Sequence, residues 1–504
     1  MTFLDALKGV VGADNVLHQG DLSAWEVDWR QRARGKALAV VRPANTDQVA
    51  QVVALCAQNR VSLVPQGGNT GMVVGSTPDD SGSQIVLSLT RMQRIREIDR
   101  ANLTVTVEAG CVLSALQEAC AAQGLLFPLS LASEGSCTIG GNLATNAGGT
   151  QVLRYGNARE LCLGLEVVSA QGDVWNGLSG LRKDNTGYDL RHLFIGSEGT
   201  LGVITAATMK LYPMPAATLT ALALVPNLQA AVQLLGLAQG RLSAGLSGFE
   251  VMGQFALGLV RKHFAQIEIP FGNVASEAQP LSPSTSDASS ASSASSASDA
   301  SNTSFCVLLE LDDHSSEEHA RGLLEQLLQE AMAESIVRDA IVAQSLAQSR
   351  QLWQIRESIP LAQAREGLNI KHDISIPISR IPAFVEETNA AIATEFPGAR
   401  MVTYGHLGDG NLHYNVQAPA NADAEAFLRD QEAPMNALVY AAVDRYHGSI
   451  SAEHGIGSLK RDTLVKHKSA QALQWMHAIK MALDPLQLMN PGRVLKPFTP
   501  PPGP

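Results

Sequence analysis

The sequence of 504 residues is poor in cysteine, and its six cysteines form neither a CxxC pair nor a metal-finger spacing. Most of them lie inside apolar runs, which is typical of buried, reduced thiols rather than of disulfides. We therefore expect free thiols at Cys56, Cys111, Cys120, Cys137, Cys162 and Cys306.

Long apolar runs and an excess of positive charge are also missing. No segment reaches about 18 uninterrupted apolar residues, and the N-terminus lacks a basic stretch followed by a long apolar one. The formal net charge of −11 argues against nucleic acid and anionic membrane surfaces as partners. We expect no membrane span, no secretory signal and a cytoplasmic location.

A content of 45% hydrophobic and 17% charged residues indicates a large core, and the length predicts two or three domains. In the first domain, residues 36–215, short apolar runs alternate with helical patterns, and Thr46 is a candidate N-cap. This domain is α/β or α+β. Its predicted strands are 38–41, 61–64, 85–89 and 103–107, and a helix is predicted over 113–123.

A second domain is predicted over residues 216–450, and its order of elements favours a sheet with helices on one face. Its predicted strands are 219–225 and 305–311, and its helices 228–237 and 315–332. A run of Ser, Ala and Asp at 282–304 cannot bury enough apolar surface to fold, so we interpret it as a flexible insertion. A helical C-terminal segment, 451–497, includes a helix over 470–483 and precedes a proline-rich tail.

Three segments of the first domain are rich in glycine: 65–71, 135–149 and 196–202. Glycine allows the backbone to approach a ligand closely, and successive free N–H groups in such turns bind phosphate. Each segment alone could be a tight turn, but three in one domain favour a phosphate-bearing cofactor. None of them matches GxGxxG at a strand–helix junction, so a Rossmann dinucleotide site is not indicated.

Histidine and glutamate gather in two segments near the C-terminus, 405–415 and 451–457. Two imidazoles and one carboxylate, His406, His413 and Glu453, suit a divalent transition metal with one position open. A strand over 412–416 would place His413 and Asn415 on one face, and the turn after His406 would bring it near His413. The alternative is that these histidines are hydrogen-bonded core groups. Asp409 is expected to stabilise the turn, and His454 could be an acid or base or a further ligand.

The sequence as a whole resembles the FAD-linked oxidases of the vanillyl-alcohol oxidase type, with a PCMH-type FAD-binding domain, and within them the D-2-hydroxyacid dehydrogenases. The resemblance runs from about Arg42 to Leu495 and is interrupted by the Ser-rich run. It is carried by the segments 66–71, 140–149, 196–202, 406–415, 453–457 and 490–492. It implies an α+β protein: a two-subdomain FAD domain, a ferredoxin-like α+β cap for the substrate, and a C-terminal helical segment packing on the FAD domain.

The resemblance also implies which residues contact the cofactor. Two loops would cradle the FAD diphosphate, residues of the third segment would line the adenine and ribose, and Asn490 would reach the flavin. The first loop has no histidine, so we expect non-covalent FAD. The implied loop residues are Gln66, Gly67, Gly68, Asn69, Thr70, Gly71, Ser133, Ser136, Thr138, Gly140, Gly141, Asn142, Thr145, Asn146, Gly148, Gly199, Gly202 and Ile204.

For the reaction, the resemblance implies that His406, His413 and Glu453 ligate a divalent metal, with zinc expected, and that His454 is the general base. Arg356 and Lys371 would bind the substrate carboxylate, and Asn415 would contact the substrate. These roles agree with the chemistry of the residue types. A metal lowers the pKa of a bound hydroxyl, a histidine takes its proton, and a guanidinium matches a carboxylate.

The implied reaction is the oxidation of D-2-hydroxyglutarate to 2-oxoglutarate by hydride transfer to flavin N5. One departure from the family bears on it. Pro360 stands where the animal hydroxyglutarate enzymes carry a threonine tied to the far carboxylate, and proline cannot donate that bond. D-lactate is therefore an alternative substrate, although Asn415 and the run Lys371-His372-Asp373 favour hydroxyglutarate. The FAD subunit of a larger complex of the glycolate oxidase type is a separate alternative, and a flavin-free zinc hydrolase is a rival of another class. The implied acceptor is an electron-transfer flavoprotein or a quinone-linked carrier, and a homodimer is one option for assembly.

Overall fold

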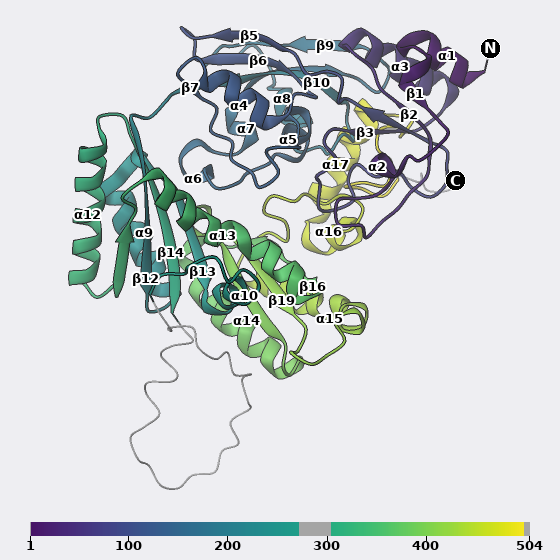
Figure 1. Cartoon of the computed structure of the whole chain (residues 1–504). Coiled ribbons are helices and arrows are strands. Elements are labelled where there is room, and N and C mark those ends of the chain that lie inside the picture. Colours follow the sequence, from purple (N-terminus) through teal and green to yellow (C-terminus); the bar gives the residue numbers. More distant parts are fainter. Residues whose placement is uncertain (1, 272–303, 498–504) are drawn as a thin grey trace. The chain divides into compact units, whose positions relative to one another are not determined.

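The computed structural model describes residues 2–271 and 304–497, and the chain divides into two compact units (Figure 1). Unit 1 contains Met1–Gly149, Tyr155–Met214 and Glu453–Pro504, and unit 2 contains Thr150–Arg154 and Pro215–Ala452. The Ser-rich run predicted at 282–304 lies outside the described residues except for Ser304, and so does the tail beyond residue 497. The two units are described separately below.

The first sheet of unit 1 is small and mixed, with the strand order β1-β2-β4-β3. Strands β2 and β3 run parallel to β4, whereas β1 is antiparallel to β2. The strand bounds are β1 Val16–Leu17, β2 Ala37–Val41, β3 Leu63–Gln66 and β4 Gln84–Ser88, and the helices are α1 Phe3–Val11, α2 Ser23–Glu26 and α3 Thr46–Asn59. The sequence placed all three of the longer strands within two residues of their bounds.

The N-cap of α3 differs from the prediction. Asn45, not Thr46, is the N-cap, and its side chain accepts a hydrogen bond from the Gln48 N–H at 2.9 Å. Thr46 is the first helical residue, and its hydroxyl donates to Glu166 Oε1 at 2.5 Å. Both residue types favour caps, and the prediction was wrong by one position because Thr46 has a buried carboxylate partner 120 residues away.

The second sheet of unit 1 is antiparallel, with the order β5-β6-β10-β8-β9. A separate two-stranded antiparallel sheet pairs β11 with β7. The strand bounds are β5 Ile95–Asp99, β6 Thr104–Glu108, β7 Leu125–Leu126, β8 Cys162–Val168, β9 Val174–Gly177, β10 Val203–Lys210 and β11 Tyr212–Pro213. The helices are α4 Leu113–Ala121, α5 Ile139–Thr145, α7 Ala158–Leu161 and α8 Arg191–Phe194. The short helix α6 Val152–Tyr155 belongs to unit 2 up to Arg154 and to unit 1 from Tyr155.

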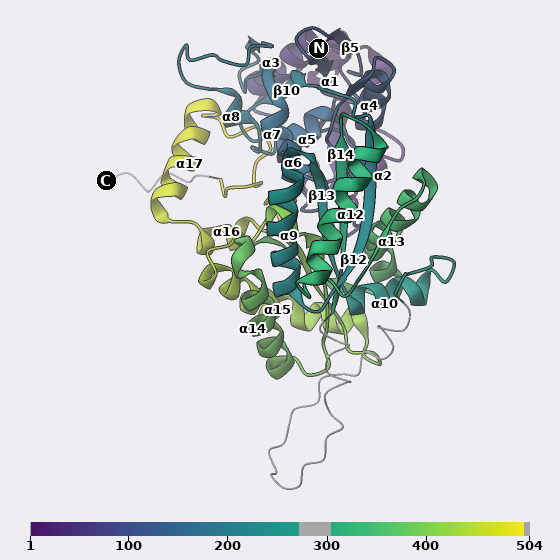
Figure 2. The same cartoon turned by 90° about the vertical axis from the view of Figure 1, so that its left-hand side faces the viewer.

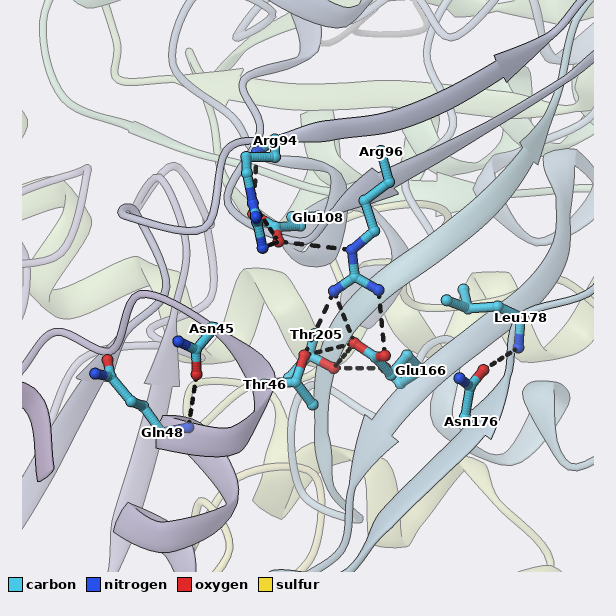
Figure 3. A network of polar contacts seen from close by, with 10 residues as sticks. All are labelled: Asn45, Thr46, Gln48, Arg94, Arg96, Glu108, Glu166, Asn176, Leu178 and Thr205. Atoms are coloured by element: carbon cyan, nitrogen blue, oxygen red, sulfur yellow. Dashed lines mark hydrogen bonds and ion pairs between the residues drawn. The ribbon is translucent and has the colours of Figure 1, made fainter.

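A buried polar network joins this sheet to the start of α3 (Figure 3). Arg96 lies between two carboxylates, with Nη2 at 3.0 Å from Glu166 Oε1 and Nε at 3.5 Å from Glu108 Oε1. Burial works to raise the pKa of Glu166, but the bonds from Arg96, Thr46 and Thr205 outweigh it, and the pKa lies below its ordinary value. The network therefore ties β5, β6, β8 and β10 to α3 through charge-assisted hydrogen bonds.

The C-terminal segment returns to the small sheet of unit 1. It forms α16 Arg461–His467 and α17 Ala470–Leu483, the latter with the predicted bounds. Beyond α17, the Leu63 N–H donates to the Leu488 carbonyl at 2.8 Å and the Asn490 N–H donates to the Leu63 carbonyl at 2.7 Å. The C-terminal segment is thus hydrogen-bonded to β3, and the yellow ribbon lies beside β3 in Figure 1.

Unit 2 is built on one large antiparallel sheet, with the order β15-β12-β14-β13-β18-β19-β16 and with β17 also pairing with β19. The strand bounds are β12 Ala217–Val225, β13 Leu246–Gly253, β14 Phe305–Asp313, β15 Asp339–Val342, β16 Asn369–Ile370, β17 Asp373–Ser375, β18 Arg400–His406 and β19 Asn411–Gln417. The helix bounds are α9 Leu228–Leu242, α10 Gln254–His263, α12 Glu317–Ala333, α13 Leu346–Glu366, α14 Ile381–Glu395 and α15 Ala424–Arg445.

Helices cover both faces of this sheet, so the prediction of helices on one face was wrong. On β13, Phe249 and Val251 belong to the core that includes α9, α12, α14 and α15, whereas Met252 belongs to the core that includes α10 and α13. Figure 2 shows α9 and α12 side by side along the sheet. The face under α13 is the one that carries the candidate catalytic groups.

All six cysteines are buried and free of disulfides, as predicted. Burial raises the pKa of several of these thiols, to about 12 for Cys56, Cys162 and Cys306. Among the helices in the described part of the chain, none combines the length and apolar character needed to cross a membrane.

Candidate active site

The first two glycine-rich loops of unit 1 pack so closely that their backbones are in contact. A Cβ atom added to Gly67 would lie 2.3 Å from Thr138 Oγ1, and one added to Gly68 would lie 2.0 Å from the Ser136 carbonyl oxygen. Any side chain at either position would therefore push the loops apart. The loop after β3 and the loop before α5, 70 residues apart, form one continuous backbone surface.

Polar side chains of the first loop bond mainly to backbone carbonyls of the segment around α2. Gln66 donates to the carbonyls of Trp25 and Ser76, and Asn69 donates to the carbonyl of Val27 at 2.9 Å. These two side chains fix the conformation of the first loop. Because their donors are already used, the loop could contact a cofactor mainly through its backbone groups.

The second loop ends in the short helix α5. Thr138 is its N-cap and accepts from the Gly141 N–H, while Thr145 donates to the Gly141 carbonyl at 3.1 Å. Asn146 is the left-handed C-cap, and its Oδ1 accepts from the Arg159 N–H at 3.0 Å. The predicted cofactor residues of this loop therefore have structural bonds that fix its path.

The third glycine-rich segment holds the C-terminal segment through Glu198. This buried carboxylate accepts from the Ile456 and Gly457 N–H groups, each at 2.7 Å. Burial raises the pKa of Glu198, although these two N–H donors oppose the rise. The segment that carries Glu453 and His454 is thus fastened to unit 1 directly beyond those residues.

Asn490 bonds to the third glycine-rich segment and to the chain just beyond the first. Its Nδ2 donates to the carbonyls of Gly75 and Glu198, both at 2.8 Å. Its Oδ1 is buried and has no hydrogen-bond partner within residues 2–271 and 304–497. A buried acceptor of this kind calls for a donor, whereas the backbone N–H groups of the glycine loops call for acceptors such as phosphate oxygens. The residues present therefore fit a cofactor with both phosphates and N–H groups.

All the predicted cofactor residues lie in unit 1. Gly199 adopts a left-handed conformation beside Pro65, Gly202 has no room for a side chain next to Val167, and Ile204 is buried in β10. Their individual contacts with FAD remain predictions, as do those of Thr70, Gly71, Ser133, Ser136, Gly140, Gly141, Asn142 and Gly148.

In unit 2, His406 and His413 lie together as predicted. His406 is the last residue of β18, and the turn Leu407–Asp409 reverses the chain into β19. In this pair of strands, Tyr404 of β18 lies opposite His413 of β19. The two imidazole centroids are 5.4 Å apart. Asp409 Oδ1 accepts from the Asn411 N–H at 3.0 Å, which confirms its expected role in the turn.

Arg356 and His406 share a carboxylate that sequence reasoning missed. Arg356 Nε donates to Glu250 Oε2 at 2.6 Å, and Glu250 Oε1 is 2.5 Å from His406 Nδ1. Burial alone would raise the pKa of Glu250, but His406 and Arg356 outweigh it and lower the pKa to about 2. Arg356 is itself buried, so it is not the solvated surface charge that its type would suggest.

Tyr404 joins Arg356 to His413. The Arg356 guanidinium carbon lies 4.9 Å from the centre of the Tyr404 ring, and that ring lies 4.8 Å from the His413 imidazole. Cation–π contact of this kind fixes the plane of a guanidinium. Sequence reasoning also missed Tyr404 as a site residue, because an aromatic residue on a strand normally indicates a core position.

Asn415 lies farther along β19, and Lys371 lies in the link between β16 and β17. Asn415 is buried on β19, two residues from His413, and its Oδ1 accepts from the His372 N–H at 3.1 Å. Its Nδ2 donates to Gln363 Oε1 at 3.1 Å. Lys371 precedes His372 in the link between β16 and β17, so it lies at the Asn415 end of the group.

Gln363 is a further residue missed from the sequence. Because the His372 N–H fixes Asn415 Oδ1 as an acceptor, Asn415 must donate to Gln363 Oε1, and this orients the Gln363 amide. Its Nε2 is then a buried donor that has no hydrogen-bond partner among the described residues. Gln363 is seven positions after Arg356 on α13, a spacing that puts both on one face of the helix.

Glu453 and His454 open the C-terminal segment of unit 1. Glu453 Oε2 accepts from the Gly149 N–H at 3.1 Å, so this residue is bonded to the second glycine loop. Immediately before it, the Ala452 N–H of unit 2 donates to the Asp373 carbonyl at 3.3 Å. Asp373 is the partner of His413 in the β17–β19 ladder, so the residue before Glu453 is bonded to the strand that pairs with the histidine strand.

Comparisons with known proteins identify a family for both parts of the chain, the one with the glycine-rich loops and the one with His406, His413 and Arg356. Residues 37–177 match the model of an FAD binding domain, and residues 214–494 match that of the C-terminal domain of FAD linked oxidases. The chain therefore belongs to the FAD-linked oxidase family, which excludes the flavin-free hydrolase considered above. It is an FAD-dependent oxidoreductase.

Within this family the chain lies in the branch of the D-2-hydroxyacid dehydrogenases. It is 37% identical over 493 residues to the mitochondrial D-2-hydroxyglutarate dehydrogenase of Bos taurus, covering 98% of this chain and 83% of the relative. It is 33% identical over 505 residues to a putative mitochondrial D-lactate dehydrogenase of Schizosaccharomyces pombe, covering 97% and 89%. The solved structure of p-cresol methylhydroxylase shares the fold, with a TM-score of 0.70 at 16% identity, covering 98% and 96%.

Proposed function

We propose that this protein oxidises a D-2-hydroxy acid to the 2-oxo acid with FAD and a divalent metal, and that D-2-hydroxyglutarate is its substrate. The observation that carries the proposal is the grouping of His406, His413 and Arg356 on one face of the sheet of unit 2. The two imidazoles suit a metal ion, and the neighbouring guanidinium suits a carboxylate. The names of the relatives support this substrate class.

FAD would be held by the backbone of the touching glycine loops, with Asn490 Oδ1 as an acceptor for an N–H of the flavin. When bound, it supplies an acceptor for the hydride of the substrate Cα. The loops 66–71 and 133–148 provide N–H groups without side chains in the way, which suits a diphosphate.

A divalent metal, with zinc expected, would be held by His406, His413 and Glu453. Two nitrogens and one carboxylate oxygen form a donor set that leaves a position open for substrate. When bound, such an ion acts as a Lewis acid and lowers the pKa of a coordinated hydroxyl. Support comes from the closeness of the two imidazoles and from the hydrogen bond that joins Ala452, the residue before Glu453, to the Asp373 carbonyl.

The side chains would then divide the remaining work. His454 takes the proton from the hydroxyl oxygen as the general base. Arg356 and Lys371 bind carboxylate oxygens and orient the Cα hydrogen, because two fixed contacts restrict rotation of the acid. Asn415 contacts the substrate at the end of the site nearer to Lys371.

The choice of hydroxyglutarate over lactate depends on a second carboxylate. Gln363 Nε2 is a buried donor beside Asn415, and a buried unmet donor costs about 1–3 kcal/mol until an acceptor binds. A distal carboxylate would satisfy it, whereas the methyl group of lactate would not. Against this, Pro360 cannot donate a hydrogen bond, so D-lactate is the second candidate. Electrons would pass to an electron-transfer flavoprotein or a quinone-linked acceptor.

Anaerobic mixing of the purified, yellow protein with single substrates tests the proposal. D-2-hydroxyglutarate is expected to bleach the flavin absorbance near the visible maximum, and the L-enantiomer is not. If D-2-hydroxyglutarate, D-lactate, D-malate and glycolate all leave the spectrum unchanged, the protein is not a dehydrogenase of these acids on its own. Iron–sulfur absorption in partners that copurify would then favour the glycolate oxidase type of complex.

Replacing the proposed base separates proton transfer from cofactor binding. His454→Ala is expected to slow flavin reduction by about 100-fold or more, while FAD stays bound. His477→Ala, on α17, is the control and should reduce at the rate of the unaltered protein. An unchanged rate in His454→Ala would remove it as the base.

A further inference from the structure

Glu250 is a fully buried carboxylate in the middle of the largest sheet. It lies on β13, directly opposite His406 in the β13–β18 ladder, and none of its surface is exposed. A buried charge is costly unless it is paired and hydrogen-bonded. The strand could have carried an apolar residue here, as it does at Val251 and Met252, so the carboxylate needs a reason beyond packing.

Both oxygens of Glu250 are used, and each serves a different proposed ligand-binding residue. Oε2 accepts from Arg356 Nε at 2.6 Å, and Oε1 is 2.5 Å from His406 Nδ1. Neither partner belongs to β13: Arg356 comes from α13, and His406 from the end of β18. One carboxylate therefore fixes two side chains from two further elements.

For His406, the contact selects the tautomer. Nδ1 lies 2.5 Å from Glu250 Oε1, and a carboxylate oxygen accepts, so Nδ1 is the nitrogen of His406 that donates. The lone pair is then on Nε2, which is the nitrogen that a metal requires. Histidine ligands usually have such a carboxylate on the other nitrogen, and its removal typically costs 10- to 100-fold in metal affinity.

For Arg356, the contact sets the direction of the guanidinium. A planar group held through Nε, and lying over the Tyr404 ring, has its two terminal nitrogens fixed in one plane. Those nitrogens are the ones that would form a two-point bond with a carboxylate. Without Glu250, the cation would be buried without this anion, and its side chain would reorient toward other acceptors.

We propose that Glu250 is a positioning residue that holds the imidazole of His406 and the guanidinium of Arg356 in register, so that one carboxylate sets both the metal affinity and the carboxylate affinity of the site. This inference rests on the proposed function. It assigns to Glu250 no contact with substrate or cofactor.

The test uses full-length, FAD-loaded protein from which metal has been stripped. Calorimetric titration with Zn²⁺ reports on His406, and titration of the metal-free protein with 2-oxoglutarate reports on Arg356 without a metal in the way. Glu250→Gln is expected to weaken Zn²⁺ binding at least 10-fold and 2-oxoglutarate binding at least about 5-fold.

Two further variants guard against a trivial loss of folding. Glu310→Gln alters the other buried glutamate on this face, which bonds to Trp353 one turn before Arg356, and both affinities should stay within twofold. Glu250→Asp keeps the charge on a shorter side chain that cannot reach both partners, so it should fold, as judged by its Tm, and still lose affinity for both probes.

The outcomes are distinguishable. If the unaltered protein binds neither Zn²⁺ nor 2-oxoglutarate, the proposed function fails. If it binds both and Glu250→Gln and Glu250→Asp bind them equally well, or if only one affinity falls, Glu250 is not the shared anchor. If Glu310→Gln loses both affinities to the same extent, the effect is general to buried charge on this face, and the inference is overturned.

Discussion

The carboxyl group of Glu310 shows how strongly burial can act on one residue of this protein. It accepts a hydrogen bond from Trp353 Nε1 at 2.7 Å and lies near the Asp312 carboxylate. Burial, with a smaller contribution from Asp312, raises its pKa to about 7. Unlike Glu250, it has no arginine among its described bonding partners, so the neutral form is favoured in the folded state.

This raised pKa predicts a pH-dependent stability. Between the ordinary glutamate pKa of about 4.3 and the folded value of about 7, the folded state binds more protons than the unfolded state. The contribution of Glu310 is therefore fully present at low pH and is lost as the pH rises toward 7, by up to roughly 1 kcal/mol per pH unit.

Glu310→Gln, which stays uncharged, removes that dependence. Its Tm relative to the unaltered protein is expected to be higher at pH 8 than at pH 5, measured by differential scanning fluorimetry. The exposed Glu334→Gln is the control and should show the same Tm difference at both values. An equal difference for Glu310→Gln would mean that the group is ionised throughout.

Gln363 carries a prediction about substrate choice. Gln363→Met removes the donor that we assign to a distal carboxylate while keeping a similar volume. The kcat/KM for D-2-hydroxyglutarate is expected to fall about 10-fold or more, equivalent to about 1.4 kcal/mol, and that for D-lactate to stay within about threefold. Steady-state kinetics with an artificial acceptor measures both. An equal fall for both acids would mean that Gln363 acts through Asn415 alone.

At the scale of elements, the network around Arg96 predicts how the parts of unit 1 depend on one another. Arg96 on β5 pairs with Glu166 on β8 and with Glu108 on β6. Arg96→Met would leave Glu166 without its cation in a mostly buried position. We expect a loss on the order of 2 kcal/mol, less than for a fully buried pair because Arg96 is partly exposed.

Arg94→Met is a matched control for this loss. Arg94 bonds to the same Glu108, at 2.8 Å, but its side chain is 72% exposed, against 28% for Arg96. Its removal should cost no more than about 1 kcal/mol. Chemical denaturation followed by tryptophan fluorescence compares the two, and equal losses would show that the network is not what joins β8 to β5.

The elements also show what could be predicted from the sequence. The bounds of α17 were predicted because its apolar residues follow the helical period, and the structure adds Ser469 as its N-cap. The turn between β18 and β19, and the closeness of His406 and His413, followed from glycine and strand periodicity. Both features could be predicted because they depend on residues that are close together in the sequence.

Glu250 could not be found in this way. A charged residue on a strand normally indicates a solvated face, and only the packing of α13 over β13 makes this one a buried anchor. The two-sided coverage of the unit 2 sheet was missed for the same reason, because α10 and α13 pack through contacts distant in sequence. Glu198 and Gln363 likewise gain their roles from partners in other elements.

At the scale of the whole molecule, the two units hold different parts of the proposed reaction. Unit 1 gathers the three glycine-rich segments, Asn490 and the 453–457 segment, and unit 2 holds His406, His413 and Arg356. The FAD site would thus be built within one unit from stretches more than 400 residues apart. Ligand binding should stabilise that unit in particular.

Hydrogen exchange with and without FAD tests this division. At about 100 times its Kd, FAD stabilises what binds it by about 2.7 kcal/mol, which corresponds to roughly 100-fold slower exchange for amides that exchange through unfolding of unit 1. Peptides from 63–76, 133–149, 196–202 and 453–457 should therefore slow together, although the last of these lies far along the chain. Peptides from β12 and β14 of unit 2 serve as the internal control and should keep their rates. Equal protection across β12 and β14 would mean that the units unfold as one, and unchanged rates in 453–457 would mean that Glu198 does not fasten this segment to the FAD site.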